Sequence, residues 1–481
     1  MTLLNPLDAA WLYVESYETP MHVAGLQIFS PPRGAPDDYV GRMVASFKKT
    51  RHLAPPWNLK LAGGLINWVY PGWTVDESPD LDYHVRHSGL PRPGGERELG
   101  ILVSRLHSQP LDFTRPLWEC HFIEGLAHGR FAVYTKMHHS LIDGVSGMRL
   151  LQKMLSTDPD RRGMPAPFAG GPPRHSRATG EPTDETAEGS LAGALAALAG
   201  IAGEQVESLG HVGLALLKLV NAETQADDAL RAPLTCPWSV VNGRITAQRR
   251  LATQSLDLAD VKALAKQSGC TLNDVVLAIC SAALRRFLLE LHALPEEALT
   301  AGLPVNVRLA GDEATGTAIS FICANLATNL ADPRERLAAI SASTRRAKEH
   351  LQALPATALT HYTMTIMAPY ILQILTGLGG RLRPVFNVTI SNVPGPDRPL
   401  YLNGARLEAM YPVSLLSHGQ ALNITCLSYA GRLHFGFTGC RDTLPHMQRL
   451  AVYSGEALRE LQTTTRRRAP ARRRVQPGDR R

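Results

Sequence analysis

The stretch Lys136-Met-His-His-Ser-Leu-Ile-Asp-Gly144 places two adjacent histidines just before an aspartate and a glycine. It closes a β-like run from Phe131 to Met137 and precedes a helical pattern over residues 146–155. An imidazole with an ordinary pKa of about 6.5 can accept a proton near neutral pH. At the end of a strand such a base can reach a bound hydroxyl, and the carboxylate of Asp143 can brace the turn that aims it. We therefore expect a catalytic turn between a strand and a helix.

Two other interpretations of the paired histidines weaken on inspection. Zinc proteases place their ligands as H-E-x-x-H on a helix, whereas these histidines are adjacent at a strand end, and no third ligand set lies nearby in the sequence. We therefore predict no metal site. The second interpretation is that both histidines are buried structural groups. Because adjacent strand residues face opposite ways, we expect one of the two to be structural and the other to face a substrate.

Length and cysteine content limit the class of protein. At 481 residues the chain is too long for one ordinary core, so we expect two domains or lobes. Its 44% hydrophobic residues fit a globular enzyme. Seven cysteines without a C-x-x-C pair argue for a reducing compartment and against a disulfide framework. The N-terminus shows no secretory signal pattern, and we expect a cytoplasmic protein.

The net charge of +7 is concentrated at one end. Residues 466–481 contain eight arginines and one aspartate, which accounts for the whole excess and leaves the body formally neutral. Such a tail is usually solvated and disordered. The functional alternative is adhesion to an anionic membrane surface. No aromatic residues interleave with the arginines, so we expect no nucleic acid partner.

The composition along the chain indicates four regions. Mixed α/β patterns over 1–156 and 244–465 predict an N-terminal and a C-terminal lobe, separated by a flexible linker with apolar helices (157–243) and followed by a basic tail (466–481). Within the lobes we expect four local structures: a helix over 96–107, a strand over 131–137, a helix from 271 to 287 capped by Thr271 and Asp274, and a β-hairpin over 421–438.

Residues 355–380 contain no charged side chain and are interrupted by Pro369, Gly377, Gly379 and Gly380. These interruptions make a transmembrane helix improbable. We favour a buried core helix. The alternative is one wall of a tunnel for a long alkyl chain, where each buried methylene contributes about 0.8 kcal/mol.

Several motifs together indicate a family. The chain from Leu4 to about Leu461 resembles the bacterial wax ester synthase/diacylglycerol acyltransferase family, part of the superfamily of chloramphenicol acetyltransferases and peptide-synthetase condensation domains. H-H-x-x-x-D-G alone would indicate only the superfamily. The more specific combination is Leu4-Asn-Pro-Leu-Asp8, Pro20-Met-His-Val23, Arg115-Pro-Leu-Trp118, Asn273-Asp-Val-Val276, Ser391-Asn-Val-Pro-Gly-Pro396 and Gln420-Ala-Leu-Asn-Ile424.

The resemblance implies an α/β fold of two chloramphenicol-acetyltransferase-like lobes with an active-site tunnel between them. It makes His139 the general base, with His138, Asp143 and Gly144 keeping the geometry of the motif. Asn273 is a candidate oxyanion donor with Asp274 in support, although Asn273 could equally satisfy buried backbone. The remaining motif residues are expected to shape the tunnel or the core: Pro116, Leu117, Trp118, Ser391 and Asn392.

The resemblance also implies the reaction. A fatty acyl-CoA, acting as substrate rather than cofactor, would acylate a long-chain alcohol to a wax ester or diacylglycerol to triacylglycerol. No covalent acyl-enzyme is needed, and the sequence holds no G-x-S-x-G elbow. The expected location is the surface of a membrane or lipid droplet. Two alternatives stay open: a condensation-type acyltransferase for an amine or carrier-bound acceptor, and a non-enzymatic lipid-droplet binding protein.

Overall fold

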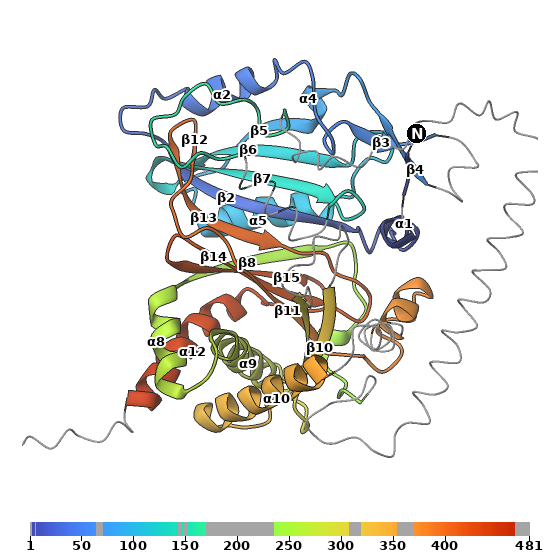
Figure 1. Ribbon diagram of the computed structural model, residues 1–481, viewed down its shortest axis with the longest axis vertical. Helices are drawn as coiled ribbons and strands as arrows, with labels where there is room; N and C mark the ends of the chain where they lie inside the picture. The colour runs from blue at the N-terminus through green and yellow to red at the C-terminus, as the bar shows by residue number, and fades with distance from the viewer. Residues whose placement is uncertain are drawn as a thin grey trace, which may run out of the picture.

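The computed structural model describes residues 2–4, 6–63, 71–142, 147, 150, 152, 154–169, 235–306, 319–353, 367 and 369–466. Two lobes, each built on a mixed sheet, lie one above the other in Figure 1. The predicted two-lobe α/β fold is confirmed. The expected linker and apolar helices fall mostly outside the described residues. Asp143, Gly144, the tail beyond Arg466 and half of the residues expected to form a helix over 146–155 also lie outside them.

The sheet of the N-terminal lobe has the strand order β12-β13-β2-β7-β6-β5. Its central pair, β2 and β7, is antiparallel, with His22 opposite His138. A small separate sheet, β1-β4-β3, lies at the edge of this lobe. The strands are β1 (Thr2–Leu3), β2 (His22–Ser30), β3 (Leu59–Leu61), β4 (Gly72–Val75), β5 (Val85–Gly89), β6 (Trp118–Leu126), β7 (Arg130–His138), β12 (Tyr401–Leu402) and β13 (Ala405–Val413). The helices are α1 (Pro6–Tyr13), α2 (Tyr39–Phe47), α4 (Leu81–His84) and α5 (Glu96–Ser108).

The sheet of the C-terminal lobe has the order β10-β9-β11-β14-β15-β8. Four helices pack on it and bury an apolar core that includes most of α9. The strands are β8 (Arg249–Asp257), β9 (Thr300–Asn306), β10 (Ile319–Asn325), β11 (Val388–Val393), β14 (Leu422–Tyr429) and β15 (Arg432–Cys440). The helices are α8 (Leu258–Ser268), α9 (Leu272–Glu290), α10 (Pro333–Ala353) and α12 (Arg449–Arg466).

Four local predictions are confirmed: α5, β7, the capped start of α9, and the β14–β15 hairpin. At α9 the Thr271 hydroxyl accepts the Asp274 N–H (3.2 Å), and the Asp274 carboxylate accepts the Thr271 N–H (2.9 Å). Within the Ser391–Pro396 motif, residues 391–393 complete β11 and pair in parallel with β14. Only from Pro394 on does the chain leave the sheet.

The two lobes are joined through the strands as well as along the chain. β12 and β13 fall within the range predicted for the C-terminal lobe, yet β13 pairs with β2 of the N-terminal sheet. It then lies against β15 so closely that a side chain at Gly436 would meet the Pro412 carbonyl oxygen at 1.8 Å. On the other side, Ser104 and Ser108 of α5 accept the backbone N–H groups of Leu251 (2.9 Å) and Arg249 (2.8 Å) at the edge strand β8.

A buried histidine adds a polar contact across the lobes. His107, at the end of α5, donates from Nε2 to the Ser414 carbonyl (3.1 Å) and accepts at Nδ1 from the Tyr134 hydroxyl (2.8 Å). A carbonyl can only accept, so Nε2 carries a proton, and the Tyr134 hydroxyl can donate to Nδ1 of the neutral imidazole. Burial is the main cause that lowers the pKa of His107 to about 3.

We expect Gly436→Ala to destabilise the protein by about 2 kcal/mol or more, because a methyl group cannot share space with a backbone carbonyl. The free energy of unfolding in denaturant checks this. Gly100→Ala is the matched control, since a methyl there meets its nearest atom, the Leu251 carbonyl oxygen, at an ordinary 3.6 Å. Equal stability of the two variants would contradict the close packing of β13 on β15.

We also expect His107 to make stability depend on pH. Below pH of about 6.5 the unfolded chain binds a proton at this residue, whereas the folded protein does not until about pH 3, so stability is lost as the pH falls through this window. His107→Gln should reduce the slope of unfolding free energy against pH by up to about 1.4 kcal/mol per unit between pH 6 and 4.5. Exposed His52→Gln serves as the control, and an unchanged slope in His107→Gln would contradict the assignment.

Candidate active site

The two-histidine turn is held by backbone hydrogen bonds on both sides. The His138 N–H donates to the Leu117 carbonyl (3.0 Å), and the His139 N–H donates to the Met21 carbonyl (2.8 Å). Leu117 belongs to the Arg115–Trp118 motif and Met21 to the Pro20–Val23 motif. Motifs far apart in the sequence therefore meet at the end of β7, which is the reason they matter to this turn.

The His138 side chain is fully buried and both its nitrogens are engaged. Nδ1 accepts the Ser140 N–H (3.1 Å) and lies 2.6 Å from the Ser140 hydroxyl, and Nε2 donates to the Glu15 carboxylate (2.6 Å). The ring of Phe113 meets the imidazole edge-on, with ring centroids 5.7 Å apart. His138 therefore positions the turn and has no nitrogen left to meet a substrate.

His139, the first residue after β7, is only half-buried. Its imidazole lies against the indole of Trp11 from α1, with ring centroids 4.3 Å apart and planes tilted by 31°. Contact with an aromatic face restricts how an imidazole ring turns. The two histidines therefore differ in burial, since His138 is enclosed and His139 is partly open to solvent.

Glu15 links the parts of the turn and was missed from the sequence. Its carboxylate, 8% exposed, accepts both the Met21 N–H (3.0 Å) and His138 Nε2–H (2.6 Å). Met21 in turn holds the His139 backbone, so a single carboxylate orients both histidines. The available signal was one acidic residue lying between the Leu4–Asp8 and Pro20–Val23 motifs.

A buried cluster supports β7 directly before the turn. Lys136 has no exposed surface, and its ammonium donates to the carbonyls of Leu106 (3.2 Å) and Gln109 (3.0 Å) and pairs with Glu119 (3.2 Å). Burial would raise the pKa of Glu119, but the hydrogen bond from His121 and the positive charge of Lys136 lower it to about 2. The cluster is thus an ion pair that fixes the end of α5 to the strand.

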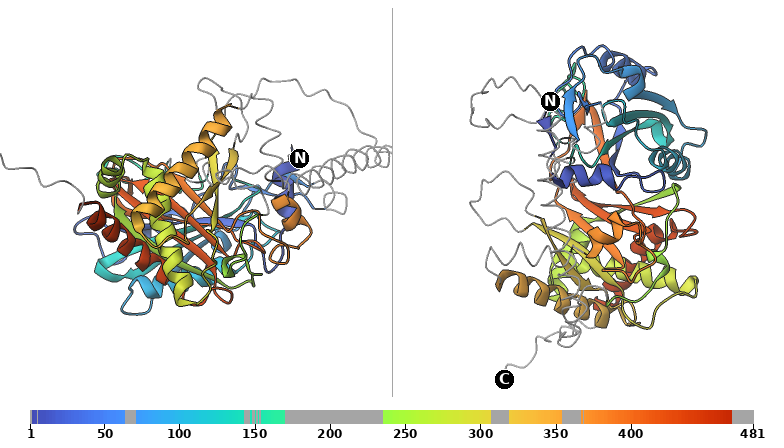
Figure 2. Two further views of the ribbon diagram at one scale, coloured as in Figure 1. Left: turned by 90° about the horizontal axis from the view of Figure 1, so that it is seen from below. Right: turned by 90° about the vertical axis from the view of Figure 1, so that its right-hand side faces the viewer.

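A cavity of about 340 Å³ opens beside this turn, between the lobes. Glu15 and Met21 line it, so it reaches the residues that hold the two histidines. Its N-terminal wall follows α1, and its C-terminal wall includes the residues after the helix 369–375. Both lie on the same side of the molecule in Figures 1 and 2. The lining residues are Tyr13, Val14, Glu15, Ser16, Thr19, Met21, Arg244, Ile374, Leu375, Thr376, Gly377, Ser417 and His418.

The C-terminal candidates have distinct surroundings. Asp274 is buried, and besides capping α9 it accepts the hydroxyls of Thr344 (2.6 Å) and Ser341 (3.1 Å) from α10. Its carboxylate therefore joins two helices. Asn273, one residue earlier, is half-buried in the first turn of α9. Ser391 and Asn392 are half-buried on β11.

Trp118 is a core residue. It is fully buried, its indole N–H donates to the Trp57 carbonyl (2.6 Å), and its ring stacks on His84 (4.4 Å) and Phe168 (5.4 Å). Leu117 is equally buried, and Pro116 accepts the Trp118 N–H (2.8 Å) in a tight turn. These residues act on the site through the Leu117 carbonyl that holds His138.

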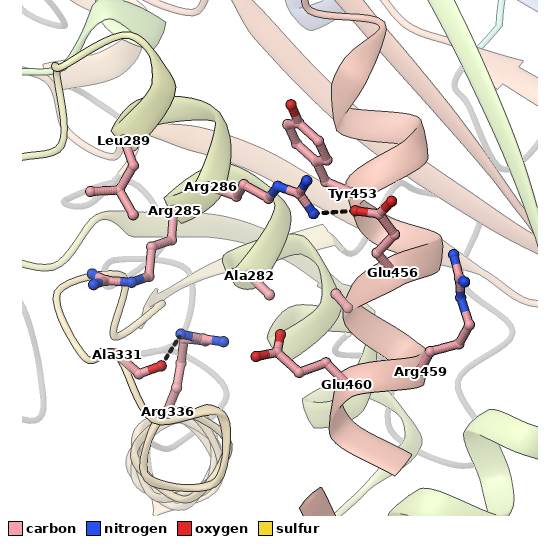
Figure 3. A pocket seen from close by; sticks show the side chains of 11 residues that line it. Ala282, Arg285, Arg286, Leu289, Ala331, Arg336, Tyr453, Glu456, Arg459 and Glu460 are labelled. Atoms are coloured by element: carbon pink, nitrogen blue, oxygen red, sulfur yellow. Dashed lines mark hydrogen bonds and ion pairs between the residues drawn. The ribbon is translucent and has the colours of Figure 1, made fainter. Parts of the chain in front are cut away.

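A larger cavity, about 580 Å³, lies elsewhere, between α9, α10 and α12 (Figure 3). Its arginines serve the fold: Arg285 donates to the Thr328 carbonyl (2.7 Å), Arg336 to that of Leu330 (2.8 Å), and Arg286 pairs with Glu456. None of the predicted site residues lines it. The larger cavity is therefore separate from the turn after β7, whereas the smaller one reaches Glu15 and Met21, which hold that turn.

The described part of the chain offers neither a metal site nor a membrane-spanning helix. In those ranges no group of three or more His, Cys, Asp or Glu side chains is arranged to hold a metal ion. Within the same ranges, every helix is too short or too polar to cross a lipid bilayer.

Comparison with known proteins adds independent evidence. The wax ester synthase/diacylglycerol acyltransferase catalytic domain matches residues 4–276, and the C-terminal domain of the same family matches residues 315–462. A Mycobacterium tuberculosis protein named as a putative diacylglycerol O-acyltransferase is 48% identical, over 95% of this chain and 96% of its own length. A second one, named as a probable diacylglycerol O-acyltransferase, is 43% identical over 96% of this chain and 99% of its own.

Solved structures agree. The wax ester synthase/diacylglycerol acyltransferase of Marinobacter aquaeolei is 38% identical and superposes with a TM-score of 0.77, over 96% of this chain and all of that one. The first condensation domain of the calcium-dependent antibiotic synthetase shares the fold at 17% identity, with a TM-score of 0.54 over 96% of this chain and 95% of its own. The family expected from the sequence motifs is confirmed: the chain belongs to the wax ester synthase/diacylglycerol acyltransferase family.

Proposed function

We propose that this O-acyltransferase moves a fatty acyl group from acyl-CoA to the hydroxyl of a long-chain alcohol or a diacylglycerol, with His139 as general base. The observation that carries the proposal is the different environment of the two histidines in the turn. His138 is buried with both nitrogens engaged, whereas His139 is half-buried. Glu15 and Met21, which hold the turn that carries both histidines, line a cavity shared by the two lobes. Matches to family members over nearly the whole chain support the same reaction.

The reaction needs a proton to move twice. As the acceptor oxygen attacks the thioester carbonyl, His139 takes the hydroxyl proton, and a C–O bond forms. When the C–S bond of the tetrahedral intermediate breaks, the imidazolium returns that proton to the CoA thiolate. General acid–base assistance of this kind is worth about 10²–10⁴-fold. The negative oxygen of the intermediate needs a donor, and the half-buried Asn273 remains our candidate.

The proposed partners follow from the substrates. Acyl-CoA is water-soluble, whereas diacylglycerol and long-chain alcohols reside in membranes or lipid droplets. We therefore propose a cytoplasmic protein that works at such a surface without spanning it, with the arginine-rich tail as one possible contact. No cofactor is required for this chemistry, because the thioester supplies the activated acyl group.

We expect His139→Ala to lower acceptor-dependent CoA release by about 100-fold or more, through loss of the base. The assay offers palmitoyl-CoA with hexadecanol and with 1,2-dipalmitoylglycerol separately, and detects the free thiol. Exposed His52→Ala is the control and should keep full activity. Normal ester formation by His139→Ala would contradict the proposed role of His139 as general base. Activity only with amine or carrier-bound acceptors would instead support a condensation-type reaction, and lipid binding without CoA release a non-enzymatic role.

Glu15→Ala should lower kcat by about 10- to 100-fold, because a shift of about 1 Å in a catalytic group has an effect of this size. Glu15→Gln should recover most of the activity, since an amide oxygen can still accept from Met21 and His138. Glu18→Ala is the matched control, an exposed glutamate three residues away. If Glu15→Gln were as inactive as Glu15→Ala, charge rather than hydrogen bonding would be the contribution of Glu15, and the positioning role would be wrong.

A further inference from the structure

Four large apolar side chains are exposed on one segment beside the cavity. Ile371, Leu375, Leu378 and Leu382 are 37%, 50%, 37% and 46% exposed. They lie on the helix 369–375 and the turns that follow it. The interpretation of residues 355–380 as a buried core helix is therefore wrong for the part that the structure describes. We call these four residues, with Arg381 and Arg383, the rim surface.

The rim surface lies at the mouth of the cavity. Leu375 lines the cavity while half of its surface is open to solvent. Across from it, Tyr13 at the end of α1 also lines the cavity and is 47% exposed, and nearby Tyr17 is 70% exposed. In both Figure 1 and Figure 2, α1 and the helix 369–375 are neighbours. Apolar side chains of both lobes thus flank one opening.

The fold holds this segment so that its apolar side chains face outward. Arg244 donates to the Gly377 carbonyl (2.9 Å), and the Gln373 amide donates to the Arg383 carbonyl (2.8 Å). Gly379 sits so close to the His418 backbone that a side chain would meet its carbonyl oxygen at 2.0 Å. The leucines are therefore exposed on a turn that is packed against the fold, and Gly379 makes that close packing possible.

The charges around the rim surface are positive. Residues 350–396 contain no aspartate or glutamate, and Arg381 and Arg383 are exposed among the leucines. The Glu18 carboxylate lies 3.4 Å from His418, and the guanidinium of Arg244 lies 3.2 Å from the same imidazole. Apolar side chains that enter the acyl boundary, next to arginines that reach lipid headgroups, are the pattern of an interfacial membrane contact.

We propose that the rim surface docks the protein on an anionic lipid surface, so that the cavity mouth faces the lipid in which the acceptor is dissolved. A second copy of the chain fits less well, because a two-fold contact would bring the arginines of both copies together. The part of this inference that concerns a lipid-dissolved acceptor rests on the proposed function. It goes further by assigning the docking to a defined surface of the folded lobes rather than to the C-terminal tail.

The test is co-sedimentation of the full chain with vesicles of phosphatidylcholine, with and without phosphatidylglycerol. Leu378→Ser with Leu382→Ser, neither of which lines the cavity, should weaken vesicle binding by about tenfold or more. Arg381→Gln with Arg383→Gln should remove much of the preference for phosphatidylglycerol. The matched control is Leu289→Ser with Val452→Ser, equally exposed leucine and valine on α9 and α12. Unchanged binding of both rim variants would overturn the proposal.

Activity assays separate this inference from the proposed function. With 1,2-dipalmitoylglycerol in vesicles, Leu378→Ser with Leu382→Ser should lose activity in proportion to binding, while a short-chain alcohol dissolved in water should be acylated as by the unaltered protein. No acylation of either acceptor by the unaltered protein would reject the proposed function and leave the vesicle result to stand alone. Sedimentation velocity tests self-association. If the unaltered protein were a dimer and the Leu378→Ser with Leu382→Ser variant a monomer that still bound vesicles, the docking proposal would be overturned in favour of self-association.

Discussion

The close packing of β13 against β15 is the constraint on which the two-lobed structure depends. β13 comes late in the chain but completes the N-terminal sheet beside β2, and Gly436 allows its Pro412 carbonyl to approach β15. Backbone N–H groups at the edge of β8 donate hydrogen bonds to serine hydroxyls on α5 of the other lobe. A site shared by two lobes needs their relative position fixed, and here each lobe contributes backbone groups that the other satisfies.

The turn after β7 is held in place by residues from three separate parts of the chain. Its backbone is held by Leu117 and Met21, and the Glu15 carboxylate joins Met21 to His138. His138 is buried with both nitrogens engaged, while His139, the first residue after β7, is half-buried against Trp11. The hydrogen bonds of the first histidine thus help to fix the backbone that carries the second.

Local features of this chain were predictable from sequence, and long-range ones were not. The caps of α9 and the β14–β15 hairpin depend on residues a few positions apart, and both appear as expected. The pairing of β13 with β2 and the contact of Glu15 with His138 join residues separated by more than 100 positions. The pattern of apolar and polar residues along the sequence does not reveal which distant residue will be in contact. The motifs predicted the turn through family resemblance, while its supporting carboxylate became visible only in three dimensions.

The uncharged segment before Arg381 shows why composition cannot place a residue. Its lack of charge says that the segment avoids water, but core, tunnel wall and membrane surface satisfy this equally well. Exposure of Ile371, Leu375 and Leu378 removes the first interpretation for the described part. Leu375 also lines the cavity, so the same segment forms part of the cavity wall and part of the exposed apolar surface. An enzyme whose acceptor is dissolved in lipid has a physical reason to combine them, since the acceptor can then pass from lipid to cavity without crossing water.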